Sequence, residues 1–204
     1  MSRVVATVRI GAVASMLLIA AACSGVDESP DSISGGAVAT EASTATAPPV
    51  HATSELDAEV PFDAMFIDSM VEHHRGAIAM AERVRFESER PELRAMAEEI
   101  IDAQVAEIGQ LESWRVEWYP GLLQTDGMGM AMGDMEVSGD EAVPFDQRFI
   151  GAMIAHHEGA VGMAEEALTQ AEHEELRALA QAIIDAQTAE IAQLEAWEAE
   201  WFGS

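Results

Sequence analysis

The feature that most constrains the fold of this chain is an internal duplication. In the 204-residue sequence, residues 60–118 match residues 143–201 at an offset of 83 positions, without gaps, and the second repeat is taken to span 143–202. Val60-Pro-Phe-Asp63 returns as Val143-Pro-Phe-Asp146, and Ile100-Ile-Asp-Ala-Gln104 returns as Ile183-Ile-Asp-Ala-Gln187. A match of this length indicates two copies of one structural unit, and such units bury their apolar surface by packing on each other.

Each unit is predicted to form two helices joined by a short turn. The first helix, roughly 62–86, follows Pro61, and the second, roughly 91–118, opens with Pro91, a residue favoured in the first turn. The second unit gives 145–170 and 173–202 in the same way. Because the turns are short, the helices of each unit should be antiparallel. Two such hairpins facing each other predict an all-α four-helix bundle.

The segment between the units, residues 119–142, is long for a loop in a compact domain. It can span a helix of about 38 Å, so a crossover connection is open to it. Its methionines indicate either a flexible loop or a metal site, and both interpretations stay open; they are Met128, Met130, Met132 and Met135.

The first 58 residues are expected to lie outside the bundle. Residues 1–22 combine two Arg, a short apolar stretch and small residues before Cys23, as in a secretory signal peptide. The position of Cys23 is similar to a bacterial lipobox, which predicts a lipid-anchored protein on the extracytoplasmic face of the cell membrane; an ordinary secretory signal is the alternative. Residues 23–58 then form a flexible tether, and the bundle spans 59–203.

The charge of the chain excludes several partners. Loss of Arg3 and Arg9 with the signal peptide changes the formal charge from −27 to −29. Such a charge argues against nucleic acid and anionic lipid, and it attracts cations. Cys23 is the only cysteine, so a metal site in the bundle must use His, Met or carboxylate. No catalytic constellation is recognised, so a binding protein is predicted rather than an enzyme.

The candidate site residues share the apolar face of the first helix in each unit. At 100° per residue, His73 and His74 lie with Phe66 on the side that faces the bundle. His73 and His74 diverge by about 100°, so they are not expected to bind one ion together, and one of them can face the other repeat. The full set is Met70, His73, His74 and Met80, repeated as Met153, His156, His157 and Met163.

The second helix of each unit adds polar residues to its apolar stripe. Gln104 and Glu107 are expected to be buried, and Gln187 and Glu190 repeat them. Buried polar groups need partners. Glu107 can either accept an imidazole N–H, and so orient the ring, or bind metal directly.

This donor set indicates copper. On one helix face, Met70, His73 and Met80 offer thioether, imidazole and thioether. Thioethers select Cu(I), and imidazole accepts Cu(I) or Cu(II), whereas Mg²⁺ and Ca²⁺ prefer oxygen. Ag(I) is expected to bind as Cu(I) does. Methionines at helical spacing also serve as ordinary core packing, and that interpretation stays open.

The repeated pattern Phe-Asp-x-x-Phe-Ile-x-x-Met-[Val/Ile]-x-His-His-x-Gly-Ala-[Ile/Val]-x-Met-Ala, followed by Ile-Ile-Asp-Ala-Gln-x-Ala-Glu-Ile, resembles the CopM-like family, long catalogued as a domain of unknown function. The resemblance covers about 60–202. It implies a ferritin-like four-helix bundle and extracytoplasmic copper binding through the Met and His residues named above.

The sequence leaves two other functions open besides copper sequestration or delivery. A ferritin-like di-iron enzyme uses Glu from two helices and Glu-x-x-His from the other two. Here Met70 and Met153 stand where that motif places Glu, so only Glu107 and Glu190 remain as core carboxylates. A metal-free tethered interaction module is the third function, and its stability should not respond to metal ions.

Overall fold

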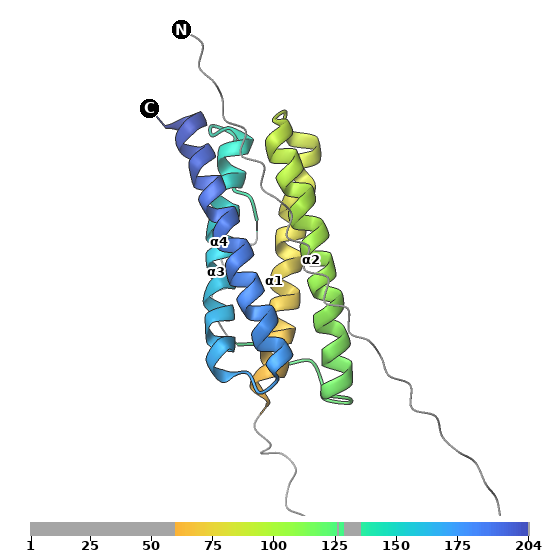
Figure 1. Ribbon diagram of the computed structural model, residues 1–204. Coiled ribbons are helices and arrows are strands. Elements are labelled where there is room, and N and C mark those ends of the chain that lie inside the picture. The colour runs from red at the N-terminus through yellow and green to blue at the C-terminus, as the bar shows by residue number, and fades with distance from the viewer. Residues whose placement is uncertain (1–59, 126, 129–135, 204) are drawn as a thin grey trace, which may run out of the picture. The chain divides into compact units, whose positions relative to one another are not determined.

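The computed structural model describes residues 60–125, 127–128 and 136–203. Within these ranges the chain forms four helices: α1 (Phe62–Glu87), α2 (Pro91–Trp118), α3 (Phe145–Gln170) and α4 (Glu174–Phe202) (Figure 1). The predicted all-α bundle of two helix hairpins is confirmed, and the helix bounds agree to within one residue. The predicted signal peptide, Cys23 and tether lie outside the described residues. None of the helices described is both long and apolar enough to cross a membrane.

Proline marks the start of three of these helices. Pro61 and Pro144 occupy the N-cap positions of α1 and α3, and Pro91 lies in the first turn of α2. Proline fits these places because its fixed φ is compatible with helix entry and its missing N–H would have no partner within the helix. Each hairpin then folds back on itself, α1 against α2 and α3 against α4, and α1 packs against α3.

The connection between the two hairpins crosses the length of the bundle, because α2 and α3 run in the same direction (Figure 1). Its described parts lie along α1. The N–H of Thr125 donates to Asp68 Oδ2 at 2.8 Å near the start of α1, and the carbonyl of Val137 accepts from Arg83 at 3.4 Å near its end. The crossover that the loop length allows is therefore present.

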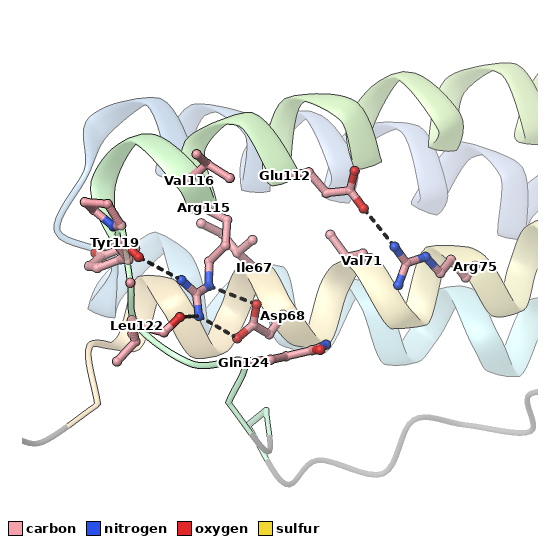
Figure 2. Close-up of a pocket in the computed structure, with 12 residues that line it drawn as sticks. Ile67, Asp68, Val71, Arg75, Glu112, Arg115, Val116, Tyr119, Leu122 and Gln124 are labelled. Carbon is pink, nitrogen blue, oxygen red and sulfur yellow. Dashed lines mark hydrogen bonds and ion pairs between the residues drawn. The ribbon is translucent and has the colours of Figure 1, made fainter.

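Arg115 fastens the start of this connection to α1 (Figure 2). Its guanidinium contacts both carboxylate oxygens of Asp68, at 3.0 and 3.3 Å. It also donates to the carbonyls of Tyr119, Leu122 and Leu123, at 3.2, 3.3 and 2.8 Å. The Arg115 and Asp68 side chains are only 13 % and 9 % exposed. A bidentate, partly buried pair of this kind is among the stronger polar contacts in proteins.

The core consists of two apolar clusters, and each combines both repeats. The first cluster joins the N-terminal half of α1 to the C-terminal half of α3, with Phe66 and Leu176 among its fully buried members. The second joins the C-terminal half of α1 to the N-terminal half of α3, with Leu93 and Phe149. Each cluster joins opposite halves of α1 and α3 because these two helices are antiparallel (Figure 1). Each repeat thus completes its core with the other.

Candidate metal centre

A polar layer crosses the middle of the bundle between the two apolar clusters. On every helix, two polar side chains separate residues of one cluster from residues of the other; on α1, His73 and His74 lie between Val71 and Ala77. The polar layer has eight members: His73, His74, Gln104, Glu107, His156, His157, Gln187 and Glu190. Polar groups in an apolar core cost stability unless they have partners, so the layer requires a functional or structural reason.

The four histidines of the polar layer are completely buried, each with 0 % exposure. The rings of His73 and His156 face each other across α1 and α3, with centroids 3.7 Å apart and planes inclined by 45°. The predicted possibility that one histidine of each pair faces the other repeat is therefore confirmed.

The other two histidines turn toward the second helix of their own repeat. Nε2 of His74 lies 2.8 Å from Oε2 of Glu107, and Nε2 of His157 lies 2.9 Å from Oε2 of Glu190. These are ion-pair distances. Neither nitrogen forms a hydrogen bond with the carboxylate, despite the short distance.

The polar layer leaves ten buried atoms without hydrogen-bond partners among the described residues. They are the eight ring nitrogens and the Oε1 atoms of Gln104 and Gln187. A buried polar atom without a partner costs about 1–3 kcal/mol, and native proteins contain few of them. So many in one layer single it out as the candidate functional site of the described chain.

Burial also determines the protonation of the facing pair. It lowers the pKa of His73 to about 2, with smaller contributions from the neighbouring imidazoles, of which His156 is the largest. Burial likewise lowers the pKa of His156 to about 3, assisted by His157 and His74. Both rings are therefore neutral near pH 7. Neutral imidazole is the form that binds metal ions.

Glu107 and Glu190 are more exposed than the sequence pattern predicts. Their side chains are 21 % and 24 % exposed, whereas Gln104 and Gln187 are 3 % exposed, as expected. The difference arises because each Glu lies toward the edge of its helix's apolar stripe. Its carboxylate reaches the surface while one oxygen touches a buried imidazole.

The four candidate helix methionines are buried, but they divide between the two sides of the polar layer. Met70 shares the first cluster with Met163, and Met80 shares the second with Met153. Met70 and Met80 are ten residues apart, about 15 Å along the helix, so the expected thioether–imidazole–thioether face cannot close on one ion. Instead, each side of the layer has one thioether from each repeat.

Within the described part of the chain, no three side chains of His, Cys, Asp or Glu, those of the polar layer included, come together closely enough to enclose one ion. Met128 packs in part against the first cluster, and its N–H donates to Ser69 Oγ at 2.8 Å. Met130, Met132 and Met135 lie outside the described residues, so a metal site in the loop stays a prediction.

A cluster that the sequence did not predict lies at the turn between α3 and α4. Asp63 is fully buried and accepts the backbone N–H groups of Glu172 and His173 at 2.9 and 3.0 Å. Its Oδ2 also lies 2.7 Å from Nδ1 of His173. The His173 ring stacks on Trp118, with centroids 3.7 Å apart and planes 3° from parallel. This cluster attaches the start of α1 to the α3–α4 turn.

The duplicated positions form a related cluster at the turn between α1 and α2. Nε of Arg90 lies 3.2 Å from Oδ2 of Asp146, and the guanidinium lies 4.0 Å from the centre of the Trp201 ring. The repeated Asp of the Val-Pro-Phe-Asp motif and the repeated Trp are the sequence signals that could have revealed both clusters. His173 by itself, unrepeated and in a turn, gave no such signal.

Fold and site together define a class: all-α bundles made from a duplicated helix hairpin, with a buried layer of histidines at the centre. The chain belongs to the DUF305 family, described as "Domain of unknown function (DUF305)", whose model matches residues 31–115 and 63–198. No curated protein has a matching sequence.

Several solved structures are similar to this chain. CopM in the Cu(I)-bound form is 36 % identical with a TM-score of 0.59, and CopM in the Cu(II)-bound form is 36 % identical with a TM-score of 0.57. Each comparison covers 69 % of this chain and 98 % of CopM. A putative secreted DUF305 protein from Streptomyces coelicolor is 24 % identical with a TM-score of 0.56, over 69 % of this chain and 93 % of its own. That last likeness concerns the fold alone.

Proposed function

We propose that this protein binds copper outside the cytoplasm, chiefly as Cu(I), and either sequesters the ion or hands it on. The observation that carries the proposal is the set of eight buried imidazole nitrogens that form no hydrogen bond among the described residues, with methionines in the clusters on both sides. Neutral imidazole and thioether are ligands for Cu(I), and imidazole also accepts Cu(II). The residues present therefore fit copper.

The ligands that we propose are the repeated histidines and methionines. His73 and His156 supply donors from both repeats at the bundle centre, and His74 and His157 supply donors next to a carboxylate. Thioethers complete the coordination from the flanking clusters. The full set is Met70, His73, His74, Met80, Met153, His156, His157 and Met163.

Similarity to CopM supports copper binding, and the N-terminal sequence supports a location outside the cytoplasm. The solved CopM structures include Cu(I)-, Cu(II)- and Ag-bound forms, so a bundle of this family accommodates these ions. The signal-like residues 1–22 and Cys23 support export and lipid anchoring. A tethered bundle of strongly negative charge would attract cations near the membrane.

Anaerobic Cu(I) titration against a competing chelator tests the proposal. The unmodified protein should bind Cu(I) stoichiometrically, and His73→Leu/His156→Leu should weaken binding by more than about 100-fold, beyond the effect of losing a residue that only supports a ligand. His51→Gln, which removes a histidine that precedes the bundle, should bind as the unmodified protein does. Unchanged affinity in the double variant, with its helical content intact by circular dichroism, would contradict the proposal.

A further inference from the structure

The ligands proposed in and beside the polar layer are buried, so a metal ion needs a path from the surface to reach them. The four histidines have 0 % exposure, and Met70 and Met153 also have 0 %. Glu107 and Glu190 differ from the rest of the polar layer, because their side chains are 21 % and 24 % exposed. Each joins the surface directly to a buried imidazole, at 2.8 Å for His74 and 2.9 Å for His157.

We propose that Glu107 and Glu190 are access carboxylates, which capture a soft monovalent cation, Cu(I) or Ag(I), at the surface and pass it to His74 and His157. This inference rests on the proposed function. The duplication supplies two such routes, one between α1 and α2 and one between α3 and α4. Nothing in the fold favours one route over the other, because both carboxylates have similar exposure and similar distances to their histidines.

The order of ligand types along each route favours inward movement. The ion first meets a carboxylate, then the imidazole of His74 or His157, and then the facing imidazoles and the thioethers. Ligand softness rises along this path, and Cu(I) and Ag(I) prefer the softer donors. Each step exchanges one ligand for the next without oxidation or reduction of the ion. The negative charge of the chain increases the concentration of cations where the path begins.

The loss of a residue that acts only on access can be recognised from the binding kinetics. Its substitution raises the barriers for entry and for exit of the ion by the same amount. The association and dissociation rates therefore fall together, and the dissociation constant changes little. A residue that only orients an imidazole acts differently. Its loss destabilises the bound state, so it chiefly accelerates dissociation and weakens affinity.

Stopped-flow mixing of Ag(I) with the full chain can separate these two roles, with tryptophan fluorescence as the signal. Trp114 and Trp118 pack against the first cluster, and Trp197 and Trp201 pack against the second. Glu107→Gln/Glu190→Gln should lower the association rate by about tenfold or more, within the range known for electrostatic capture of ions. Either single variant should retain about half of the unmodified rate, because one route remains.

Two sets of control variants accompany this measurement. Asp102→Asn/Asp185→Asn removes the same charge from exposed, duplicated positions on α2 and α4 and should leave the rate within about twofold. A different route is offered by a hollow of about 310 Å³ that reaches Met80 and is lined also by Ala79 and Arg83. Ala79→Phe obstructs that hollow, and Gly162→Phe is its duplicate, where an added Cβ meets no atom within 4 Å. Neither should slow association.

Three results would overturn the inference alone: an unchanged association rate in the double Glu variant, a loss of affinity caused only by faster dissociation, or slowing by Ala79→Phe without slowing by the Glu variants. Absence of Ag(I) and Cu(I) binding in the unmodified protein would overturn the proposed function together with it.

Discussion

At the scale of single residues, the centre of the bundle holds more polar atoms than the described chain can satisfy. Eight ring nitrogens and two amide oxygens lie there without hydrogen bonds. Filling these positions with apolar side chains would give a more stable metal-free protein, because an unsatisfied buried group costs more than its absence. The retention of such a layer in both repeats is consistent with binding sites that compromise stability.

The facing histidines should make the metal-free protein sensitive to acid. In the folded state the pKa of His73 is about 2 and that of His156 is about 3, whereas an unfolded histidine titrates near 6.5. Between these values the unfolded chain binds protons that the folded chain does not, so the free energy of unfolding falls as the pH is lowered through this window. Chemical denaturation at pH 7 and pH 4.5 measures the change.

Carboxylates titrate in part of the same window, so a variant is needed as the reference. His73→Leu/His156→Leu lacks the two rings and keeps the carboxylates, and its stability should fall less between the two pH values. An identical fall in both proteins would show that the two rings are not neutral and buried as described.

At the scale of secondary-structure elements, two polar clusters attach each hairpin to the other: one contains Asp63 and the other contains Asp146. Asp63 accepts two backbone N–H groups and contacts His173, whereas Asp146 contacts Arg90 and leaves its Oδ1 without a partner among the described residues. Asp63→Ala should therefore lower the free energy of unfolding by about 3 kcal/mol, since it leaves buried donors without acceptors. Denaturant unfolding at constant pH gives the value.

The duplicate position supplies the matched control for this prediction. Asp146→Ala should cost clearly less, about 1 kcal/mol, because its partner Arg90 is half-exposed and keeps contact with Trp201. A greater cost for Asp146→Ala than for Asp63→Ala would contradict the assignment of the stronger cluster to Asp63.

The crossover connection should depend on Arg115. This side chain joins Asp68 to three carbonyls at the start of the connection. Arg115→Met keeps much of the side-chain volume and removes the donors, so residues 119–125 should exchange their amide hydrogens faster than in the unmodified protein. Exchange in the middle of α3 should change much less. Equal protection of residues 119–125 in both proteins would show that Arg115 does not hold the connection.

At the scale of the whole molecule, the duplication predicted the four helices, their ends and the pairing within each hairpin. The 100° divergence of His73 and His74 also showed that the two rings must take different neighbours. Which neighbours they take depends on how the two hairpins dock, and a single repeat carries no signal for that. For the same reason the pattern on one helix suggested that Met70 and Met80 act together, although each lies instead with a methionine of the other repeat.

The packing of the two hairpins against each other also explains why some side chains differ from expectation in their exposure or their contacts. Glu107 lies at the edge of an apolar stripe, and only the neighbouring helix decides whether such a position is covered. His173 acquires its partners from Asp63, more than a hundred residues earlier, and from Trp118. Contacts of this range become visible only when the two repeats are assembled.

X-ray absorption at the copper edge of the Cu(I)-loaded bundle tests the central claim most directly, because it identifies the atoms bound to the metal. A buried layer of imidazoles with thioethers on both sides predicts a first shell that contains both nitrogen and sulfur, and His73→Leu/His156→Leu should reduce the nitrogen contribution. A first shell of oxygen and nitrogen without sulfur, unaffected by that double substitution, would contradict the account.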